Sequence, residues 1–149
     1  MERFLVLERG EGIRRAVRAG LVAWGGGAAG PSGLLVLSPR AAGSGPLRLP
    51  PCRAVLLPGE GGGTLGELRA ASAVSYGLSP RDSLTLSSRE GERLWCALQR
   101  ELVTLDGAVV ERQEFSLVPP PGLEPLPALA AAGALLILGV PPGALELGP

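Results

Sequence analysis

The sequence predicts a single α/β domain, and three observations support this fold class. A length of 149 residues is typical of one domain, and an apolar content of 46% is enough to form a core. In the first half, short apolar runs are separated by a segment with helical spacing and by loops rich in Gly and Pro. In the second half, apolar and polar residues alternate between turn signals, which is typical of an antiparallel meander.

The first half contains four apolar runs that we predict to be strands. They are residues 3–8, 34–39, 53–59 and 72–77. Between the first two, residues 11–24 carry Ile13, Val17 and Leu21 at helical spacing, which predicts an amphipathic helix. Strands separated by helices favour a parallel arrangement, so we expect a small, mostly parallel, Rossmann-like sheet with helices.

Two connecting segments of this half receive different predictions. Residues 40–52 are rich in Gly, Pro and Arg, and we predict them to be irregular and exposed. Residues 60–72 are predicted to form a short helix, because Thr64 and Glu67 fit a capping box that satisfies backbone amides at a helix start.

The second half is predicted to extend the sheet. Its strand-like segments are residues 83–88, 93–99, 101–105 and 108–118. The Asp106-Gly107 pair is a hairpin signal, since both turn residues can take positive φ. Residues 126–140 are apolar throughout and predict a buried helix that closes the domain. The single domain therefore divides into a β/α portion (1–82), a β-meander (83–118) and a C-terminal helix and tail (119–149).

The composition excludes several classes of function. The 14 basic and 14 acidic residues balance, so there is no electrostatic case for nucleic acid. The chain has no His and no Lys, and the richness in Gly, Ala, Arg and Pro is typical of a GC-rich genome. Without imidazole or ammonium groups, the commonest general base, metal ligand and amine nucleophile are missing. We therefore predict no catalytic residue, no metal site and no bound cofactor, and we do not expect an enzyme.

The sequence also bears on localisation. The start of the chain has charges within its apolar run, unlike a signal peptide. The apolar segment 126–140 is shorter than the roughly 20 residues that a spanning helix needs. We expect a cytoplasmic protein without a transmembrane segment; a peripheral membrane protein that uses its apolar C-terminal third is a further possibility.

A glycine run offers one candidate ligand site. Gly61, Gly63 and Gly66 match the spacing of a dinucleotide-binding turn, and Asp82 lies near where a ribose-binding acid would be sought. Gly61, Gly63 and Thr64 are thus candidate phosphate-binding residues, with a flexible loop as the alternative. The run is not an ATP phosphate loop, because Gly63 is followed by Thr64 without the required lysine.

A polar patch in the meander offers a second candidate. Its members are Gln99, Arg100, Glu111, Gln113 and Glu114. Cross-strand ion pairing would explain such a patch, and a face that binds a protein partner is the alternative.

From residue 53 onward, the order of features resembles the latter part of the central domain of the Mur ligases, the ATP-dependent enzymes that add amino acids to peptidoglycan precursors. The matching pieces read AVLLPGE, TLGELRA, AVSYGLS, SLTLSS and the stretch from FSLVPPP to LLILGV. The closest matches are Val74–Ser79 and Ala128–Val140. The resemblance implies a bacterial protein with part of the ligase scaffold.

The departures from that family bear on function. The phosphate-loop G-K-[ST] motif has no counterpart, and the carbamylated, magnesium-binding lysine of the family cannot exist in this chain. Leu123 and Glu124 stand where the resemblance implies a His-Asn pair. We therefore expect a degenerate, non-catalytic Mur-ligase-like protein that binds an unknown protein partner, and the resemblance implies a link to cell-wall synthesis. The alternative is a nucleotide- or phosphate-binding module that uses the Gly-rich loop 59–64.

Overall fold

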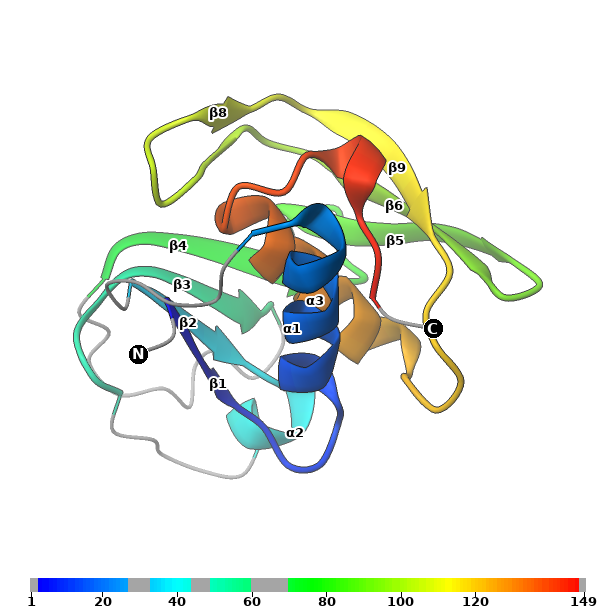
Figure 1. Ribbon diagram of the computed structural model, residues 1–149, viewed down its shortest axis with the longest axis horizontal. Coiled ribbons are helices and arrows are strands. Elements are labelled where there is room, and N and C mark those ends of the chain that lie inside the picture. Colours follow the sequence, from blue (N-terminus) through cyan, green and yellow to red (C-terminus); the bar gives the residue numbers. More distant parts are fainter. Residues whose placement is uncertain (1–2, 27–32, 44–48, 60–69, 148–149) are drawn as a thin grey trace.

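The computed structural model describes residues 3–26, 33–43, 49–59 and 70–147 (Figure 1). One seven-stranded sheet has the order β1-β2-β3-β4-β5-β6-β9. The strands are β1 (Phe4–Leu7), β2 (Leu34–Leu37), β3 (Cys52–Pro58), β4 (Ala70–Gly77), β5 (Leu84–Glu90), β6 (Arg93–Leu98) and β9 (Gln113–Leu117). Neighbours from β1 to β5 pair in parallel, whereas β5-β6 and β6-β9 pair antiparallel. The predicted fold class, an α/β domain with an antiparallel extension and a C-terminal helix, is confirmed.

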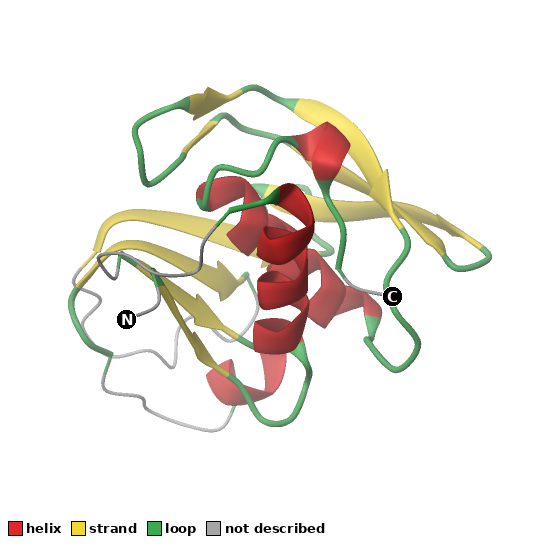
Figure 2. Cartoon of the chain, in the orientation of Figure 1, coloured by secondary structure: helices red, strands yellow, loops and turns green. Residues whose placement is uncertain are grey.

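Four helical segments lie in the described part of the chain. They are α1 (Ile13–Trp24), α2 (Pro39–Ala42), α3 (Pro125–Ile137) and the short 3-10 helix η2 (Pro142–Ala144). The α3 helix contacts β2, β3, β4 and β5, and it also contacts α1. Figure 2 shows α1 and α3 beside the curved sheet, with α3 enclosed between α1 and the strands.

The α3 helix forms the centre of the hydrophobic core. All residues from Pro127 to Ile137 are buried, so no face of the helix is reserved for water. A helix of this composition is stable only inside a protein. Burial of each large side chain, such as Leu129, Leu135 or Leu136, contributes about 1.5–3 kcal/mol.

Two glycines allow the layers to approach closely. A Cβ atom on Gly133 of α3 would lie 3.0 Å from side-chain carbons of Leu56 and Leu84 in the sheet. A Cβ atom on Gly20 of α1 would overlap the side chain of Leu135 in α3. Glycine is therefore needed at these positions for packing, and neither residue takes a positive φ.

The connection between β4 and β5 is unusually short for parallel strands, which ordinarily need a crossover of a dozen or more residues. Only residues 78–83 lie between the two strands. The register explains this, because Tyr76 and Gly77 at the end of β4 pair with Leu84 and Thr85 at the start of β5. The β5 strand thus begins where β4 ends, and it carries the sheet beyond the edge of its parallel half.

The predicted helix over 60–72 is partly wrong. Residues 60–69, with Thr64 and Glu67, lie outside the described residues. From Ala70, however, the chain is already in β4, two residues before the predicted strand. The long parallel register from Cys52–Ala70 to Pro58–Tyr76 requires this early start, since β4 must match the full length of β3.

The prediction that residues 40–52 are irregular and exposed is also partly wrong. Pro39–Ala42 form α2, and the hydroxyl of Ser38 accepts a hydrogen bond from the amide of Ala41. Ala41 and Ala42 are buried, and α2 contacts β3. A serine cap followed by proline is a helix-start signal, but one turn is too short to show helical periodicity.

The Asp106-Gly107 signal does mark a hairpin, formed by β7 (Leu102–Val103) and β8 (Val109–Val110). Only Gly107 takes a positive φ, of 88°, so the turn is not one in which both residues are left-handed. The amide of Gly107 donates to the carbonyl of Thr104. The predicted return strand over 108–118 is divided, since its first part pairs in this hairpin and its second part is β9 beside β6.

Replacement of Gly133 by valine should disrupt the contact between α3 and the sheet. We expect Gly133→Val to lower the free energy of unfolding by about 1–3 kcal/mol, because the added carbons must displace Leu56 and Leu84. Urea denaturation measures the change. The control is Gly143→Ala, since a Cβ atom there would meet nothing within 4 Å. Equal stabilities for the two variants would contradict the close approach.

Candidate functional site

The carboxyl ends of the parallel strands form the natural place to seek a ligand. In open α/β sheets, ligands bind outside this edge at the point where the strand order reverses. Among the described strands, the order follows the sequence from β1 to β6 and on to β9, without any reversal. The sheet therefore lacks the crevice that such a reversal creates, and any ligand would have to bind on the loops.

The first of these loops places a carboxylate on the start of α1. Both oxygens of Glu8 accept hydrogen bonds, from the amides of Ile13 at 2.8 Å and Arg14 at 3.0 Å. These amides, together with the positive end of the helix dipole, are the groups that bind phosphate in nucleotide-binding folds. In this protein the anion is part of the chain.

A second carboxylate from the same loop reaches α2. Glu11 is buried, and its two oxygens accept hydrogen bonds from the amides of Arg9 at 3.0 Å and Arg40 at 3.2 Å. Tyr76 is buried nearby and donates its hydroxyl proton to the carbonyl of Leu37 at the end of β2. Burial, and secondarily the negative charge of Glu11, raise the pKa of Tyr76 above its ordinary value.

A third carboxylate lies at the ends of β3 and β4. Asp82 is buried, and its Oδ2 accepts a hydrogen bond from the amide of Ser79 at 3.1 Å. A Cβ atom on either Gly59 or Gly77 would overlap this carboxylate, so both glycines are needed to accommodate it. The predicted role of Asp82 as a ribose-binding acid does not fit this geometry, because the carboxylate is enclosed.

The glycine-rich site predicted from the sequence is not tested by the structure. Gly61, Gly63 and Thr64 lie outside the described residues. The glycines that follow β1 are described: Gly10 and Gly12 take φ values of 71° and 84°, in the first strand-to-helix loop. Sequence reasoning missed this loop. The detectable signal was a Gly-Glu-Gly run between an apolar strand and an amphipathic helix, the position of a phosphate-binding turn.

The predicted polar patch is not gathered on one face. The side-chain amide of Gln99 is half-buried and donates to the carbonyls of Pro80 and Asp82, at 3.1 and 2.7 Å. Gln99 therefore holds the loop between β4 and β5. Gln113 donates to the carbonyl of Glu111, and this bond is local.

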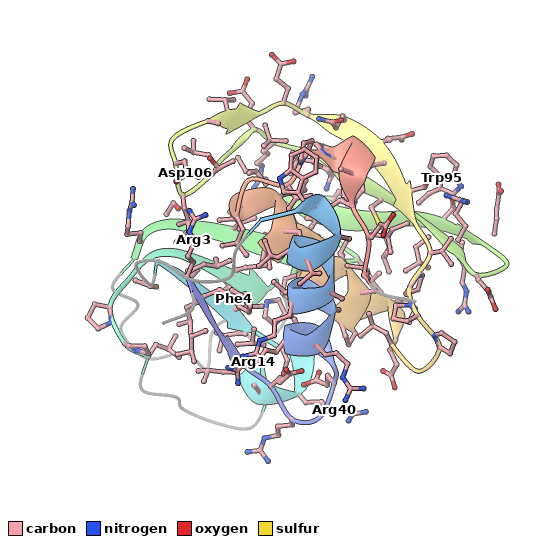
Figure 3. The ribbon with its side chains drawn as sticks, in the orientation of Figure 1. Arg3, Phe4, Arg14, Arg40, Trp95 and Asp106 are labelled. Atoms are coloured by element: carbon pink, nitrogen blue, oxygen red, sulfur yellow. The ribbon has the colours of Figure 1, made fainter. Side chains whose placement is uncertain are left out.

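The remaining residues of the patch lie on the antiparallel extension. Arg100, Glu111 and Glu114 are exposed, and Glu114 pairs in register with Ala97 of β6. In a sheet, neighbours along a strand point to opposite faces, so Gln113 and Glu114 cannot share one. Figure 3 shows Trp95 on the same extension, where it pairs in register with Ser116.

The cysteines offer no reactive thiol of the usual kind. Cys96 is fully buried in the core, and burial raises its pKa to about 12. Cys52 is half-buried, and burial raises its pKa as well. A nucleophilic cysteine instead needs a lowered pKa. Across the described ranges, no three His, Cys, Asp or Glu side chains are grouped so as to hold a metal ion.

The apolar C-terminal segment is buried rather than presented to a membrane. Leu129, Leu135 and Leu136 are each fully enclosed. Of the helices in the described part of the chain, none has both the length and the apolar character needed to cross a bilayer.

Comparison with known proteins adds no relative to this picture: no protein-family model matches the sequence, and no curated protein shows a significant match. The chemistry of the chain therefore has to be judged from its own residues.

Removal of the Glu8 carboxylate should create an anion site. We expect Glu8→Ala to lower the free energy of unfolding by about 0.5–2 kcal/mol, since two helix-start amides lose their acceptor. Inorganic phosphate should then restore part of the lost melting temperature, whereas the wild-type protein should respond much less. The control is Glu92→Ala, an exposed turn residue. An equal response to phosphate in all three proteins would contradict the assigned role of Glu8.

The buried thiol should make the protein sensitive to alkali. Because the folded state raises the pKa of Cys96 from 9.0 to about 12, it binds this proton more tightly than the unfolded state does. The resulting stability is complete below pH 9 and is lost as the pH rises from 9 towards 12. Urea denaturation between about pH 8 and pH 11 should show a fall that is up to about 1.4 kcal/mol per pH unit steeper in wild type than in Cys96→Ala. Parallel curves for these two proteins would contradict the prediction, and Cys52→Ala should change the slope less.

Proposed function

We propose that this chain is a non-catalytic protein that acts by binding a protein partner. The observation that carries the proposal is the filling of the carboxyl edge of the parallel sheet by the chain's own carboxylates. Glu8, Glu11 and Asp82 occupy positions at the ends of β1, β2 and β3–β4. Amides at the start of a helix that follows a strand are the groups that bind phosphate in nucleotide-binding folds, and Glu8 already occupies such amides at the start of α1.

The electrostatic consequence is unfavourable for nucleotides. A phosphate approaching the start of α1 would have to displace Glu8, which already makes two hydrogen bonds there. It would also meet the charge of Glu11, whose oxygens are held by the amides of Arg9 and Arg40. Like charges repel, and each of these backbone amides has only one hydrogen, which it already donates to a carboxylate.

The available side chains support the same proposal. All 14 cationic side chains are Arg, because the chain contains no Lys, and it contains no His. Guanidinium groups stay protonated and cannot serve as general bases. The described thiols and the Tyr76 hydroxyl are neutral at physiological pH, because burial raises their pKa values. A binding role needs none of these groups to react.

The cellular setting comes from the sequence. The resemblance to the Mur ligases stays a prediction. The expected location in the cytoplasm and the link to cell-wall synthesis are also predictions. Within that proposal, the chain keeps a ligase-type scaffold after losing the groups for phosphoryl transfer, and a partner protein supplies its biological effect.

The decisive test is turnover. We expect no release of phosphate above background when the protein is mixed with ATP, magnesium and muramoyl-peptide precursors. A coupled phosphate assay measures this, with an active Mur ligase as the positive control. Robust phosphate release that copurifies with the chain would overturn the proposal.

Calorimetry distinguishes the proposed function from the alternative, a nucleotide- or phosphate-binding module that uses loop 59–64. We expect no heat of binding from ATP, ADP, NAD or inorganic phosphate. Binding of one of these that Gly63→Val abolishes, and that Gly143→Ala preserves, would replace the proposed function with that alternative.

A further inference from the structure

A cavity of about 380 Å³ lies between the start of α1 and the turn at residues 120–123. Its walls are mainly apolar, and they include Ala16, Ala19, Pro120, Pro121, Leu123 and Leu147. A cavity of this volume falls within the range of ligand sites, which are mostly apolar with a few polar groups placed at the margin.

A second hollow, of about 600 Å³, adjoins the first. The two share Gly10, Gly12 and Arg15, so the loop after β1 and one guanidinium form their common wall. The second hollow is also lined by Arg14 and Arg18, which lie on the same side of α1 as Arg15. Figure 3 places Arg14 near the start of α1, at the end of the molecule where Arg40 also lies.

Gly10 and Gly12, which lie between the two hollows, have no side chain that would separate them. Gly10 has a φ of 71°, and a Cβ atom on it would meet nothing within 4 Å. A Cβ atom on Gly12 would meet only Leu123, at 3.5 Å. The surface over this loop is therefore open, and an extended chain can cross it from one hollow to the other.

The charge that remains available in these hollows is positive. The two acidic residues that line them, Glu8 and Glu11, direct their oxygens to backbone amides. Arg15 is exposed, and in the described part of the chain it makes no ion pair or side-chain hydrogen bond. A ligand carboxylate can pair with the Arg15 guanidinium without displacing a partner from the described residues.

We propose that the two hollows bind an extended peptide segment of the partner, in which an aromatic side chain fills the apolar cavity and an adjacent Asp or Glu pairs with Arg15. The inference rests on the proposed function and specifies its partner. Proline and leucine walls suit an aromatic ring, which buries a large apolar area with little loss of rotamer freedom. The charge pair sets the direction of the peptide across Gly10.

The minimal probe is the blocked dipeptide N-acetyl-Trp-Glu-amide, followed by NMR on uniformly ¹⁵N-labelled protein. We expect roughly millimolar affinity, with shifted amide signals at Gly10, Gly12 and Ala19. N-acetyl-Trp-Gln-amide should bind about threefold to fivefold more weakly, because the charge pair is lost at a solvent-exposed site. N-acetyl-Ala-Glu-amide should not bind measurably, because it lacks the ring.

Two variants locate the site. Ala19→Trp should abolish binding by filling the cavity, and Arg15→Gln should reduce affinity for the glutamate probe to that for the glutamine probe. Arg112→Gln, at an exposed position outside both hollows, is the matched control and should bind as wild type does. The ¹⁵N spectrum of each variant reports whether it is folded, and Arg15→Gln decides the question if Ala19→Trp is not.

Three outcomes would overturn the inference: no shifts with about 10 mM probe, shifts confined to another surface, or equal affinity for the Glu and Gln probes. These outcomes leave the proposed function standing as long as ATP turnover is absent. Phosphate release in the turnover assay would instead remove the proposed function, whatever the probes do.

Discussion

The α3 helix is apolar on every side, and a helix of that kind is stable in water only when protein encloses it completely. Four strands of the sheet cover one side, and α1 covers another. The close approach at Gly133 and Gly20 follows from this requirement: Leu56 and Leu84 of the sheet pack on the α3 backbone at Gly133, and Leu135 of α3 packs on the α1 backbone at Gly20. The antiparallel extension serves the same end: Leu84, Cys96 and Phe115 add their apolar side chains to the one core cluster that includes α3.

The enclosure of α3 accounts for the core of the domain. The backbone amides at the carboxyl edge of the sheet need hydrogen-bond acceptors from elsewhere. In many α/β proteins a ligand binds at that edge, and its phosphate accepts hydrogen bonds from the amides at a helix start. This chain completes the edge with Glu8 and Glu11, drawn from a single loop of five residues, and with Asp82 from the next short connection. Among the described residues, these amides at the edge therefore already have acceptors when the protein folds.

Much of the fold could be predicted from the sequence, because its signals are local. Each of these signals is carried by residues that are close in sequence: the apolar runs, the helical spacing within α1, the Asp106-Gly107 turn and the apolar stretch of α3. The failures concern information that is not local. The start of β4 at Ala70 depends on the length of β3, and the division of the last strand depends on which neighbour each part finds. The roles of Glu11 and Gln99 depend on the amide of Arg40 and on the carbonyls of Pro80 and Asp82, which only folding brings close to them. The role of Glu8 is local, because it accepts from the amides of Ile13 and Arg14 in the same loop and helix start.

The position of α3 in the chain has a consequence for biosynthesis. Every strand of the sheet precedes this helix, so a ribosome completes all of them before residues 125–137 emerge. Until then, the strands display the apolar surface that α3 later covers, and unpaired strands with exposed apolar surface aggregate readily. The core of this domain therefore cannot close until α3 has been synthesised, and until then the strands have no helix to cover their apolar face.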